Sequence, residues 1–158
     1  MNLKHTVVLS FFTIFFVAIC GAENKLTESS EISGSVTSLK SITTSEQAIR
    51  ATIQNYFNGR RNADIALLKK AYSKDARLMT TGPDNQLIVI SLEGYFAVVV
   101  KRGKVMVKTT IEDLKFEDQL AFARVVFNYG DKSYTDFLLL IKSDIGWRIV
   151  NKSFKLNK

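Results

Sequence analysis

Residues 45–82 constrain the possible folds of this chain more than any other stretch. Apolar side chains recur there at three- and four-residue spacing in two short segments, which predicts two amphipathic helices followed by a strand. Thr44 and Gln47 suit a capping box at the start of the first helix, and Gly59 predicts its end. Helices this short cannot bury their apolar faces on each other alone, so the rest of the chain must supply a sheet. The apolar face of the first helix comprises Ile49, Ile53, Tyr56 and Phe57.

The second helix is shorter, and Asp64 is its expected N-cap. A strand over 75–81 follows it. This strand ends at the sequence Gly-Pro-Asp-Asn of residues 82–85, which is the strongest turn signal in the chain. The apolar positions of the second helix are Ile65, Leu68, Ala71 and Tyr72.

Residues 91–100 carry conflicting signals. Ser91 can cap a helix, whereas Gly94 and the β-branched run at 98–100 disfavour one. We predict a helix here, because the flanking sequences suit a helix inserted between strands.

Short polar turns separate four strands in the C-terminal part, and such spacing predicts antiparallel hairpins. Residues 137–141 are apolar at every position, which predicts a central strand covered on both faces. Helices followed by an antiparallel sheet define an α+β fold with the helices on one face. A strongly bent sheet would leave a concave interior, where small-molecule sites usually lie. The expected strands are 109–116, 120–128, 132–142 and 147–156.

The N-terminal segment predicts export. Residues 1–22 combine a basic start, an unbroken apolar run and small residues ending at Ala22, which is typical of a secretory signal peptide. We therefore expect a signal peptide at 1–22, a disordered Ser/Thr-rich tether at 23–44 and a domain at 45–158, in a periplasmic or secreted protein. Two alternatives stay open: an uncleaved membrane anchor and a lipid anchor through Cys20. The apolar run is shorter than the roughly 20 residues that a spanning helix needs.

Cleavage after residue 22 would remove the only cysteine and the only histidine of the chain. The remaining chain would have no thiol nucleophile, imidazole base or disulfide, and we expect no metal and no cofactor. Its 21 basic side chains (22 less Lys4) and 15 acidic ones give a formal charge of +6. The basic clusters Arg60-Arg61 and Lys101-Arg102 are expected to be solvated. They lack interleaved aromatic residues, so we expect no nucleic-acid partner.

Four motifs in a fixed order carry a resemblance to a known superfamily. With the helices and strands predicted around them, residues 46–156 resemble the nuclear transport factor 2-like superfamily, and in particular its lumazine-binding branch. The resemblance implies a cone-shaped, ketosteroid isomerase-like fold with about three N-terminal helices packed in a strongly bent, mostly antiparallel sheet. The superfamily contains enzymes, ligand binders and dimerisation modules, so it does not decide the function. The motifs are Tyr56-Phe57-Asn58-Gly59, Ser73-Lys74-Asp75-Ala76-Arg77-Leu78, Asp136-Phe137-Leu138-Leu139-Leu140 and Gly146-Trp147-Arg148-Ile149-Val150-Asn151-Lys152.

The ketosteroid isomerases of this superfamily use a tyrosine that donates to an oxyanion, an aspartate base and a protonated second acid. By the spacing of that family, the resemblance places the tyrosine at Tyr56, eight residues before Asp64. The base position is Thr80, whose hydroxyl group cannot abstract a carbon-bound proton at neutral pH. The second acid falls near Leu138, two residues after Asp136. One of three positions is retained, which counts against isomerase chemistry.

We predict one pocket inside the bent sheet, with Tyr56 and Asp136 as the candidates for any catalysis. Asp136 shares a strand face with Tyr134, and two interpretations of its carboxylate stay open. It forms a structural ion pair with Arg124 on the neighbouring strand, or it binds ligand, because a buried charge is costly unless it is paired. The full predicted pocket set is Tyr56, Met79, Thr80, Tyr95, Arg124, Tyr134 and Asp136.

Three functions fit this sequence. The first, which we predict, is an exported, non-catalytic domain that binds a small molecule in a mostly apolar pocket. The second is an enzyme of the same fold, an isomerase, lyase or hydrolase that uses Tyr56 and Asp136. The third is a dimerisation or adaptor module whose cavity is filled by side chains. The partners we expect are a small-molecule ligand and a second copy of the chain bound through the sheet, with no stable membrane insertion after cleavage.

Overall fold

The computed structural model of the protein describes residues 28–157. The chain divides into two units, Met1–Val36 and Thr37–Lys158. In the first unit the described residues, 28–36, are helical. The signal peptide predicted at 1–22 lies outside the described residues. No helix in the described part of the chain is both long enough and apolar enough to cross a membrane.

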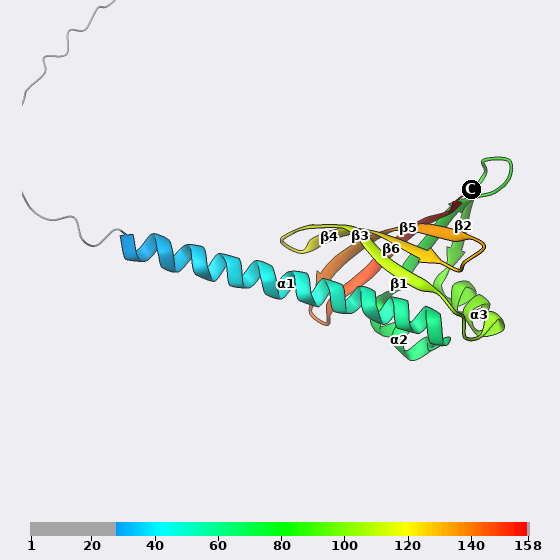
Figure 1. The fold of residues 1–158 in the computed structure, drawn as a ribbon, viewed down its shortest axis with the longest axis horizontal. Coiled ribbons are helices and arrows are strands. Elements are labelled where there is room, and N and C mark those ends of the chain that lie inside the picture. Colours follow the sequence, from blue (N-terminus) through cyan, green and yellow to red (C-terminus); the bar gives the residue numbers. More distant parts are fainter. Residues whose placement is uncertain (1–27, 158) are drawn as a thin grey trace, which may run out of the picture. The chain divides into compact units, whose positions relative to one another are not determined.

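The described residues form three helices and six strands, which Figure 1 shows in sequence colours. The predicted helices and the four predicted C-terminal strands are all present. In chain order the elements are α1 (Glu28–Asn62), α2 (Ile65–Ala71), β1 (Tyr72–Thr81), β2 (Leu87–Ser91), α3 (Leu92–Arg102), β3 (Lys108–Glu117), β4 (Leu120–Asn128), β5 (Ser133–Ser143) and β6 (Gly146–Asn157).

Two of the predicted helix starts are confirmed at the level of single hydrogen bonds. Asp64 Oδ1 accepts a hydrogen bond from the Leu67 amide at 3.0 Å, and Ser91 Oγ accepts one from the Gly94 amide at 3.1 Å. Each bond satisfies an amide that the first helical turn leaves unpaired. In α3 this cap, together with the burial of Val99, outweighs the low helix propensity of the β-branched run.

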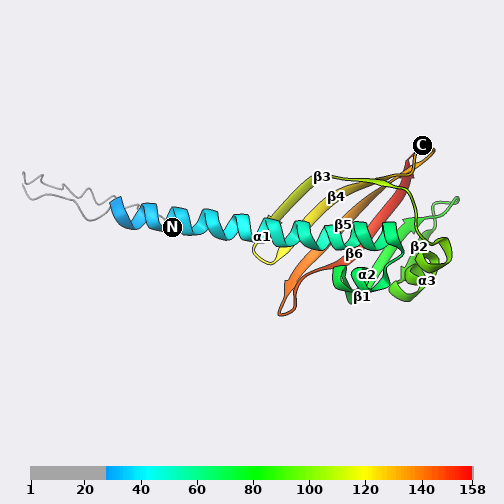
Figure 2. The same ribbon diagram turned by 60° about the horizontal axis from the view of Figure 1, so that its bottom comes forward.

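The six strands form one sheet in the order β2-β1-β6-β5-β4-β3. Every neighbouring pair is antiparallel except β1 and β6, which run parallel. The predicted α+β class with a bent, mostly antiparallel sheet is therefore confirmed. β2 has no counterpart among the predicted strands; it is a short edge strand that pairs with β1 across the predicted turn. Figure 2 shows the part of α1 next to α2 lying against the sheet.

The first helix differs from the prediction at its start. Thr44 does not cap α1, because the helix already begins at Glu28. Thr44 Oγ1 instead donates a hydrogen bond to the carbonyl of Lys40, one turn earlier, at 2.9 Å. No proline interrupts this segment, and each residue added to an existing helix costs far less than starting a new one. The helix therefore includes residues 28–44, which differs from the disordered tether predicted at 23–44; residues 23–27 of that tether lie outside the described residues.

Gly59 is not the end of α1, as predicted, but a point of close contact within it. A Cβ atom at this position would lie 2.8 Å from Leu68 Cγ and Cδ2 and 3.0 Å from the Leu68 amide nitrogen. The helix ends at Asn62, and Ala63 then turns the chain with a left-handed φ of 55°. The glycine is thus explained by the close approach of α1 and α2 and not by helix termination.

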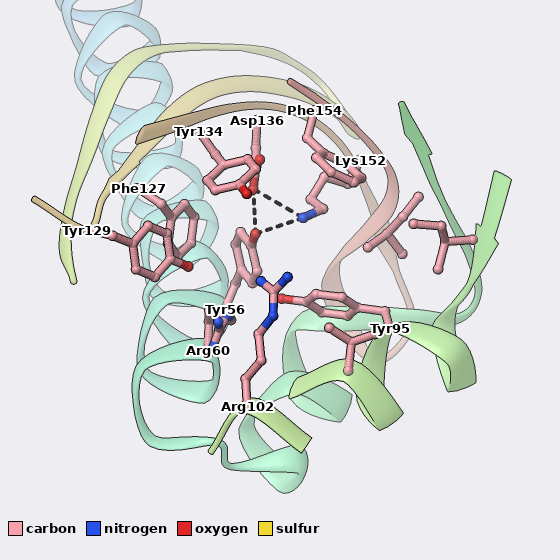
Figure 3. Close-up of a pocket in the computed structure, with 13 residues that line it drawn as sticks. Tyr56, Arg60, Tyr95, Arg102, Phe127, Tyr129, Tyr134, Asp136, Lys152 and Phe154 are labelled. Carbon is pink, nitrogen blue, oxygen red and sulfur yellow. Dashed lines mark hydrogen bonds and ion pairs between the residues drawn. The ribbon is translucent and has the colours of Figure 1, made fainter. Parts of the chain in front are cut away.

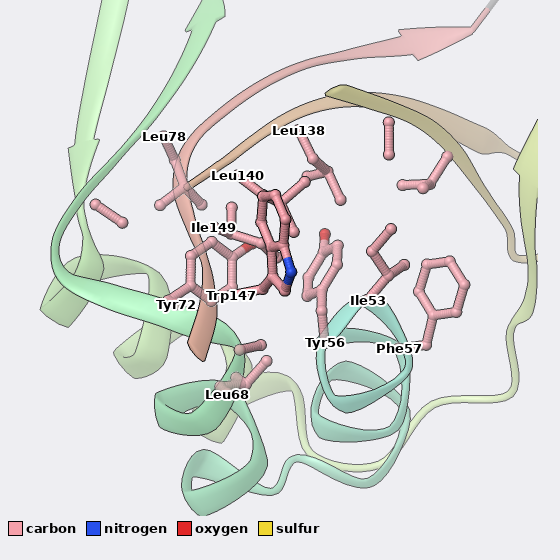
Figure 4. Packing of buried hydrophobic residues seen from close by; sticks show 14 of the residues in the cluster. Ile53, Tyr56, Phe57, Leu68, Tyr72, Leu78, Leu138, Leu140, Trp147 and Ile149 are labelled. Atoms are coloured by element: carbon pink, nitrogen blue, oxygen red, sulfur yellow. The ribbon is translucent and has the colours of Figure 1, made fainter. Parts of the chain in front are cut away.

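The core lies between the helices and one face of the sheet (Figure 4). The predicted face of α1 is buried, and Thr52 on the same helix donates a hydrogen bond to the Trp147 carbonyl at 3.3 Å. Figure 4 shows Trp147 among side chains from α1, α2 and several strands. The fully buried apolar side chains include Ile49, Ile53, Tyr56, Leu68, Leu78, Val99, Val125, Leu138, Leu140 and Ile149.

β5 is central in the sheet, as predicted, with β4 and β6 on its two sides. Leu138 and Leu140 are fully buried beneath the helices. The predicted cover on the other face is wrong for the described residues, because Phe137, Leu139 and Ile141 remain 40%, 44% and 37% exposed. The helices form a single layer, so only one face of this apolar strand is covered within the second unit.

Candidate functional site

Three polar side chains meet in the core at the inner face of the sheet (Figure 3). The Tyr56 hydroxyl donates a hydrogen bond to Asp136 Oδ2 at 2.5 Å. Lys152 Nζ donates to the Tyr56 hydroxyl oxygen at 3.2 Å and lies 3.3 Å from the same Asp136 oxygen. The three side chains are all buried. We call this group the Tyr56–Asp136–Lys152 cluster.

The three residues come from three elements that the fold brings together. Tyr56 lies on the apolar face of α1, and Asp136 lies on the inner face of β5 in alternation with Leu138 and Leu140. Lys152 reaches the inner face of β6 because Val150 is inserted into the ladder between β5 and β6. Such a bulge shifts the alternation of side chains by one position.

Burial dominates the electrostatics of the cluster. Desolvation raises the pKa of Tyr56 well above its usual value of 10.0, and the charge of Asp136 raises it further. Desolvation also lowers the pKa of Lys152, while Asp136 opposes that change. Tyr56 therefore keeps its proton at neutral pH and donates it to the carboxylate. The Lys152 ammonium group also lies 4.9 Å from the ring centre of Tyr95 and 4.5 Å from that of Phe154.

The cluster borders a cavity of about 250 Å³. Aromatic side chains from both helices and strands make up much of its wall, and Figure 3 shows their rings around the cluster. The lining residues are Tyr56, Arg60, Leu78, Ile90, Tyr95, Val98, Arg102, Phe127, Tyr129, Tyr134, Asp136, Lys152 and Phe154.

Two polar groups at this cavity have no hydrogen-bond partner among the described residues. They are Nη1 of Arg60, on α1, and the hydroxyl of Tyr95, on α3. Desolvation raises the pKa of Tyr95 well above its usual value, so its hydroxyl remains a donor at neutral pH. Buried polar atoms without a partner are rare in folded proteins. Both groups are therefore available to a molecule in the cavity.

The structure brings four of the seven predicted pocket residues to this cavity: Tyr56, Tyr95, Tyr134 and Asp136. The other three are not among the residues that line it. Met79 lies on the opposite face of β1 from Leu78, and its sulfur lies 3.8 Å from Asn151 Nδ2. Thr80 shares the face of Leu78 but lies two residues further along the strand.

The ion pair between Asp136 and Arg124, one of the two interpretations that the sequence left open, is not formed. Arg124 lies directly opposite Phe137 on β5, so it occupies the outer face of the sheet. Its Nη1 instead lies 2.9 Å from Glu112 Oε2 on β3. The carboxylate of Asp136 is paired with Lys152 because the neighbouring strand on its other side is β6.

Three basic residues of the cavity were not among the predicted site residues. Arg60, expected to be solvated, is buried and lines the cavity. It follows Tyr56 by four positions on α1, and this spacing alone would have placed both on one helical face. Arg102 ends α3 at the cavity edge. Lys152 has no such sequence signal, because strict alternation from Ile149 would turn it outward.

The polar side chains of the cavity do not form a metal site. In the part of the chain that the structure describes, no group of three or more His, Cys, Asp or Glu side chains could hold a metal ion. The cavity instead offers hydrogen-bond donors and aromatic faces, with a single carboxylate that already accepts two hydrogen bonds. This arrangement can bind a small molecule by stacking and by donated hydrogen bonds.

Solved structures of the same fold support an assignment to a class. A protein of unknown function from Shewanella baltica shares 24% identity at a TM-score of 0.68, covering 73% of this chain and 96% of that one. One from Methylobacillus flagellatus shares 25% identity at a TM-score of 0.64, covering 71% and 91%. Both are described as NTF2-like. A ketosteroid isomerase-like protein from Erwinia carotovora atroseptica shares 19% at a TM-score of 0.56, covering 71% and 95%.

The fold therefore defines a nuclear transport factor 2-like domain, with its cavity between the helices and the curled sheet. Within this superfamily, residues 44–155 match the family described as "Putative lumazine-binding", and the chain belongs to it. A comparison with curated proteins found no match.

Proposed function

We propose that this protein is an exported domain that binds a small molecule in the cavity beside the Tyr56–Asp136–Lys152 cluster. The observation that carries the proposal is the cavity itself, about 250 Å³ in volume and walled largely by aromatic rings. Membership of a family named for lumazine binding supports a small-molecule ligand. A cavity of this size counts against the alternative of an adaptor module whose interior is filled by side chains.

The internal bonding of the cluster favours binding over catalysis. The proton of Tyr56 is donated to Asp136, so it is not free to stabilise an oxyanion on a substrate. Asp136 accepts hydrogen bonds from both Tyr56 and Lys152. The position that the isomerases use for their base is Thr80, which does not line the cavity. The three polar side chains of the cluster are thus hydrogen-bonded to one another at the wall of the cavity.

Native mass spectrometry of the purified protein tests the proposal. We expect a co-purified small molecule, or one bound from a metabolite library, as an added mass on the folded chain. Val98→Trp should abolish binding, because Val98 lines the cavity. Val100→Trp is the matched control, because Val100 lies on the same helix, is largely exposed and does not line the cavity. Equal binding by the two variants, or none by the wild-type protein, would contradict the proposal.

An enzyme of the same fold is the second candidate, and one observation favours it. Burial lowers the pKa of Lys152, and a lysine with a lowered pKa loses its proton more readily, so that its neutral amine can act as a base or nucleophile. Such an enzyme, an isomerase, lyase or hydrolase, would use Tyr56 and Asp136 together with this amine. A folded Asp136→Asn protein that has lost a measurable turnover would support it. Turnover that survives Asp136→Asn and Lys152→Met would exclude this cluster as the active site.

Export is the part of the proposal that the N-terminal sequence supports. The mature protein would begin at Glu23 and be periplasmic or secreted. N-terminal sequencing of exported material checks this, and a lipid on Cys20 or a retained residue 1 would contradict it.

We also propose that two copies associate through the outer face of the sheet. Phe137, Leu139 and Ile141 form an exposed apolar row there, and the Phe137 ring stacks on Phe122 with centres 5.7 Å apart. Contiguous exposed apolar surface of this kind commonly marks a protein interface. Light scattering should give a dimer that Leu139→Glu converts to a monomer. Leu87→Glu, which changes an exposed leucine on β2, should leave the dimer intact.

A further inference from the structure

The cavity carries more positive than negative charge. Its basic residues are Arg60, Arg102 and Lys152, whereas Asp136 is the one acid among its lining residues, so the formal balance is three cations to one anion, or +2. The carboxylate of Asp136 is already bonded to Tyr56 and Lys152. Neither arginine therefore has a free carboxylate within the cavity.

Arg60 makes this imbalance costly, because only 5% of its surface is exposed. A guanidinium group keeps its charge in proteins, so losing a proton cannot relieve the burial. Its Nη1 has no hydrogen-bond partner among the described residues, and its Cζ lies 5.8 Å from the centre of the Tyr129 ring. A contact with an aromatic face recovers only part of the cost of removing a charge from water. An anion in the cavity would supply the missing partner.

Arg102 approaches the same cavity from another element. It is the last residue of α3, and its side chain is exposed to solvent while lining the cavity. Figure 3 shows it extending from the helix toward the cavity, beside Tyr95. The Tyr95 hydroxyl, which has no partner among the described residues, adds a neutral donor. Two guanidinium groups and a hydroxyl from α1 and α3 thus border one space.

The remaining wall suits a flat apolar body. Six of the 13 lining residues are aromatic. Rings from different elements lie at steep angles to one another, as for Tyr129 and Tyr134, whose planes meet at 86°. Aromatic faces and edges bind planar molecules by stacking and edge contacts, with little loss of side-chain freedom. The charged part of the wall is therefore suited to bind one part of a ligand, and the aromatic part is suited to bind another part of the same ligand.

We propose, on the basis of the proposed binding function, that the ligand is a planar organic anion. Its carboxylate or phosphate group is held by Arg60 and Arg102, and its flat body lies among the aromatic rings. Arginine is suited to both groups, because its planar fork can donate two parallel hydrogen bonds to either.

Three probes of one shape test this proposal. Binding of 2-naphthoate, 2-naphthyl phosphate and the neutral 2-naphthamide to the full chain is measured by isothermal titration calorimetry. At least one anion should bind about tenfold or more tightly than the amide, as expected when a charged group gains a hydrogen bond. The preferred anion distinguishes a carboxylate from a phosphate ligand. Rising salt concentration should weaken the anion more than the amide.

Variants then locate the charge that selects the anion. Arg102→Gln should lower the affinity for the preferred anion about tenfold and leave the amide nearly unchanged. Lys101→Gln is the matched control, because Lys101 is the exposed neighbour and does not line the cavity. Arg60→Met should remove most of the preference for anions. If Arg60→Met does not fold, as judged by the fluorescence of Trp147, the pair of variants on α3 still decides.

The outcomes separate the two proposals. Equal binding of the amide and both anions, or equal effects of Arg102→Gln and Lys101→Gln, would overturn the anion proposal while leaving a small-molecule site in place. Binding of an anion that Val98→Trp does not affect would place it elsewhere and overturn the anion proposal. Failure of all three probes to bind would contradict the anion proposal, whereas a different, uncharged molecule found by native mass spectrometry would uphold binding itself.

Discussion

Lys152 Nζ lies 3.3 Å from Asp136 Oδ2, and the two side chains are only 7% and 3% exposed. Removing one member of such a buried pair leaves the other charge without a partner in a medium that solvates it poorly. The pair between Arg124 and Glu112 has a shorter distance of 2.9 Å, but its side chains are 47% and 37% exposed. Exposure, and not distance, decides which pair matters for stability, because water screens the outer pair.

Asp136→Asn should therefore lower the free energy of unfolding by about 3 kcal/mol, because Lys152 loses its carboxylate in the core. Glu112→Gln, which breaks the exposed pair with Arg124, should cost less than about 1 kcal/mol. Urea denaturation of both variants, followed by Trp147 fluorescence, measures the difference. Equal losses in the two variants would show that the buried pair has no special weight.

Two buried tyrosines offer a matched comparison of hydroxyl groups. The Tyr56 hydroxyl is bonded to Asp136 and Lys152, whereas that of Tyr72 has no hydrogen-bond partner among the described residues. Tyr56→Phe should cost about 2 kcal/mol, since the loss of two hydrogen bonds to charged groups is partly offset by easier burial of the ring. Tyr72→Phe should be neutral or stabilising, because it removes an unpaired polar atom. Thermal unfolding of the two variants measures the difference in stability. A Tyr56→Phe protein at least as stable as Tyr72→Phe would show that the hydrogen bonds of Tyr56 contribute nothing.

Alkaline pH should unfold the protein cooperatively. Burial raises the pKa values of Tyr56, Tyr72 and Tyr95 above 10.0, so the unfolded chain loses these protons first. The stability from the three phenols is complete below pH 10.0 and falls as the pH rises above it, by up to about 1.4 kcal/mol per pH unit for each. Lys152 has the opposite effect, because its lowered pKa means that the folded protein loses this proton before the unfolded chain does. Its contribution to stability therefore rises with pH up to the usual lysine pKa of 10.5. Tyrosinate absorbance should rise together with unfolding seen by Trp147 fluorescence; ionisation in the folded state would contradict this.

Gly59 in α1 and Gly94 in α3 should change the stability in opposite directions when each is replaced by alanine. At Gly59 the new Cβ would meet Leu68 at 2.8 Å, so Gly59→Ala should cost about 2 kcal/mol through overpacking. At Gly94 the nearest atom is Ser91 Oγ at 3.4 Å, so Gly94→Ala should stabilise α3 by about 0.5–1 kcal/mol. Differential scanning calorimetry gives both changes. A stabilising Gly59→Ala would refute the close approach of α1 and α2.

Local sequence patterns were sufficient for most of the elements. The capped start of α2 at Asp64 and the hairpins of the C-terminal half follow from short-range rules of capping and turn formation. The same patterns placed Tyr56 on the inward face of its helix and Asp136 on one strand face with Leu138 and Leu140, which the structure shows to be buried. Gly59 was misinterpreted because a glycine required by packing and a glycine that ends a helix look alike in sequence.

Only the tertiary structure shows which charged side chains lie in the site. The alternation of β6 from Trp147 and Ile149 would turn Lys152 outward, and only the bulge at Val150 brings it to Asp136. Strand order then gave Asp136 its partner, because β6 and not the Arg124 face of β4 presents a cation to it. The sequence by itself determined most of the elements and the buried faces of the helices, since these depend on neighbours within a few residues. Bulges, strand order and the pairing of buried charges depend on contacts between distant segments, so only the folded chain decided them.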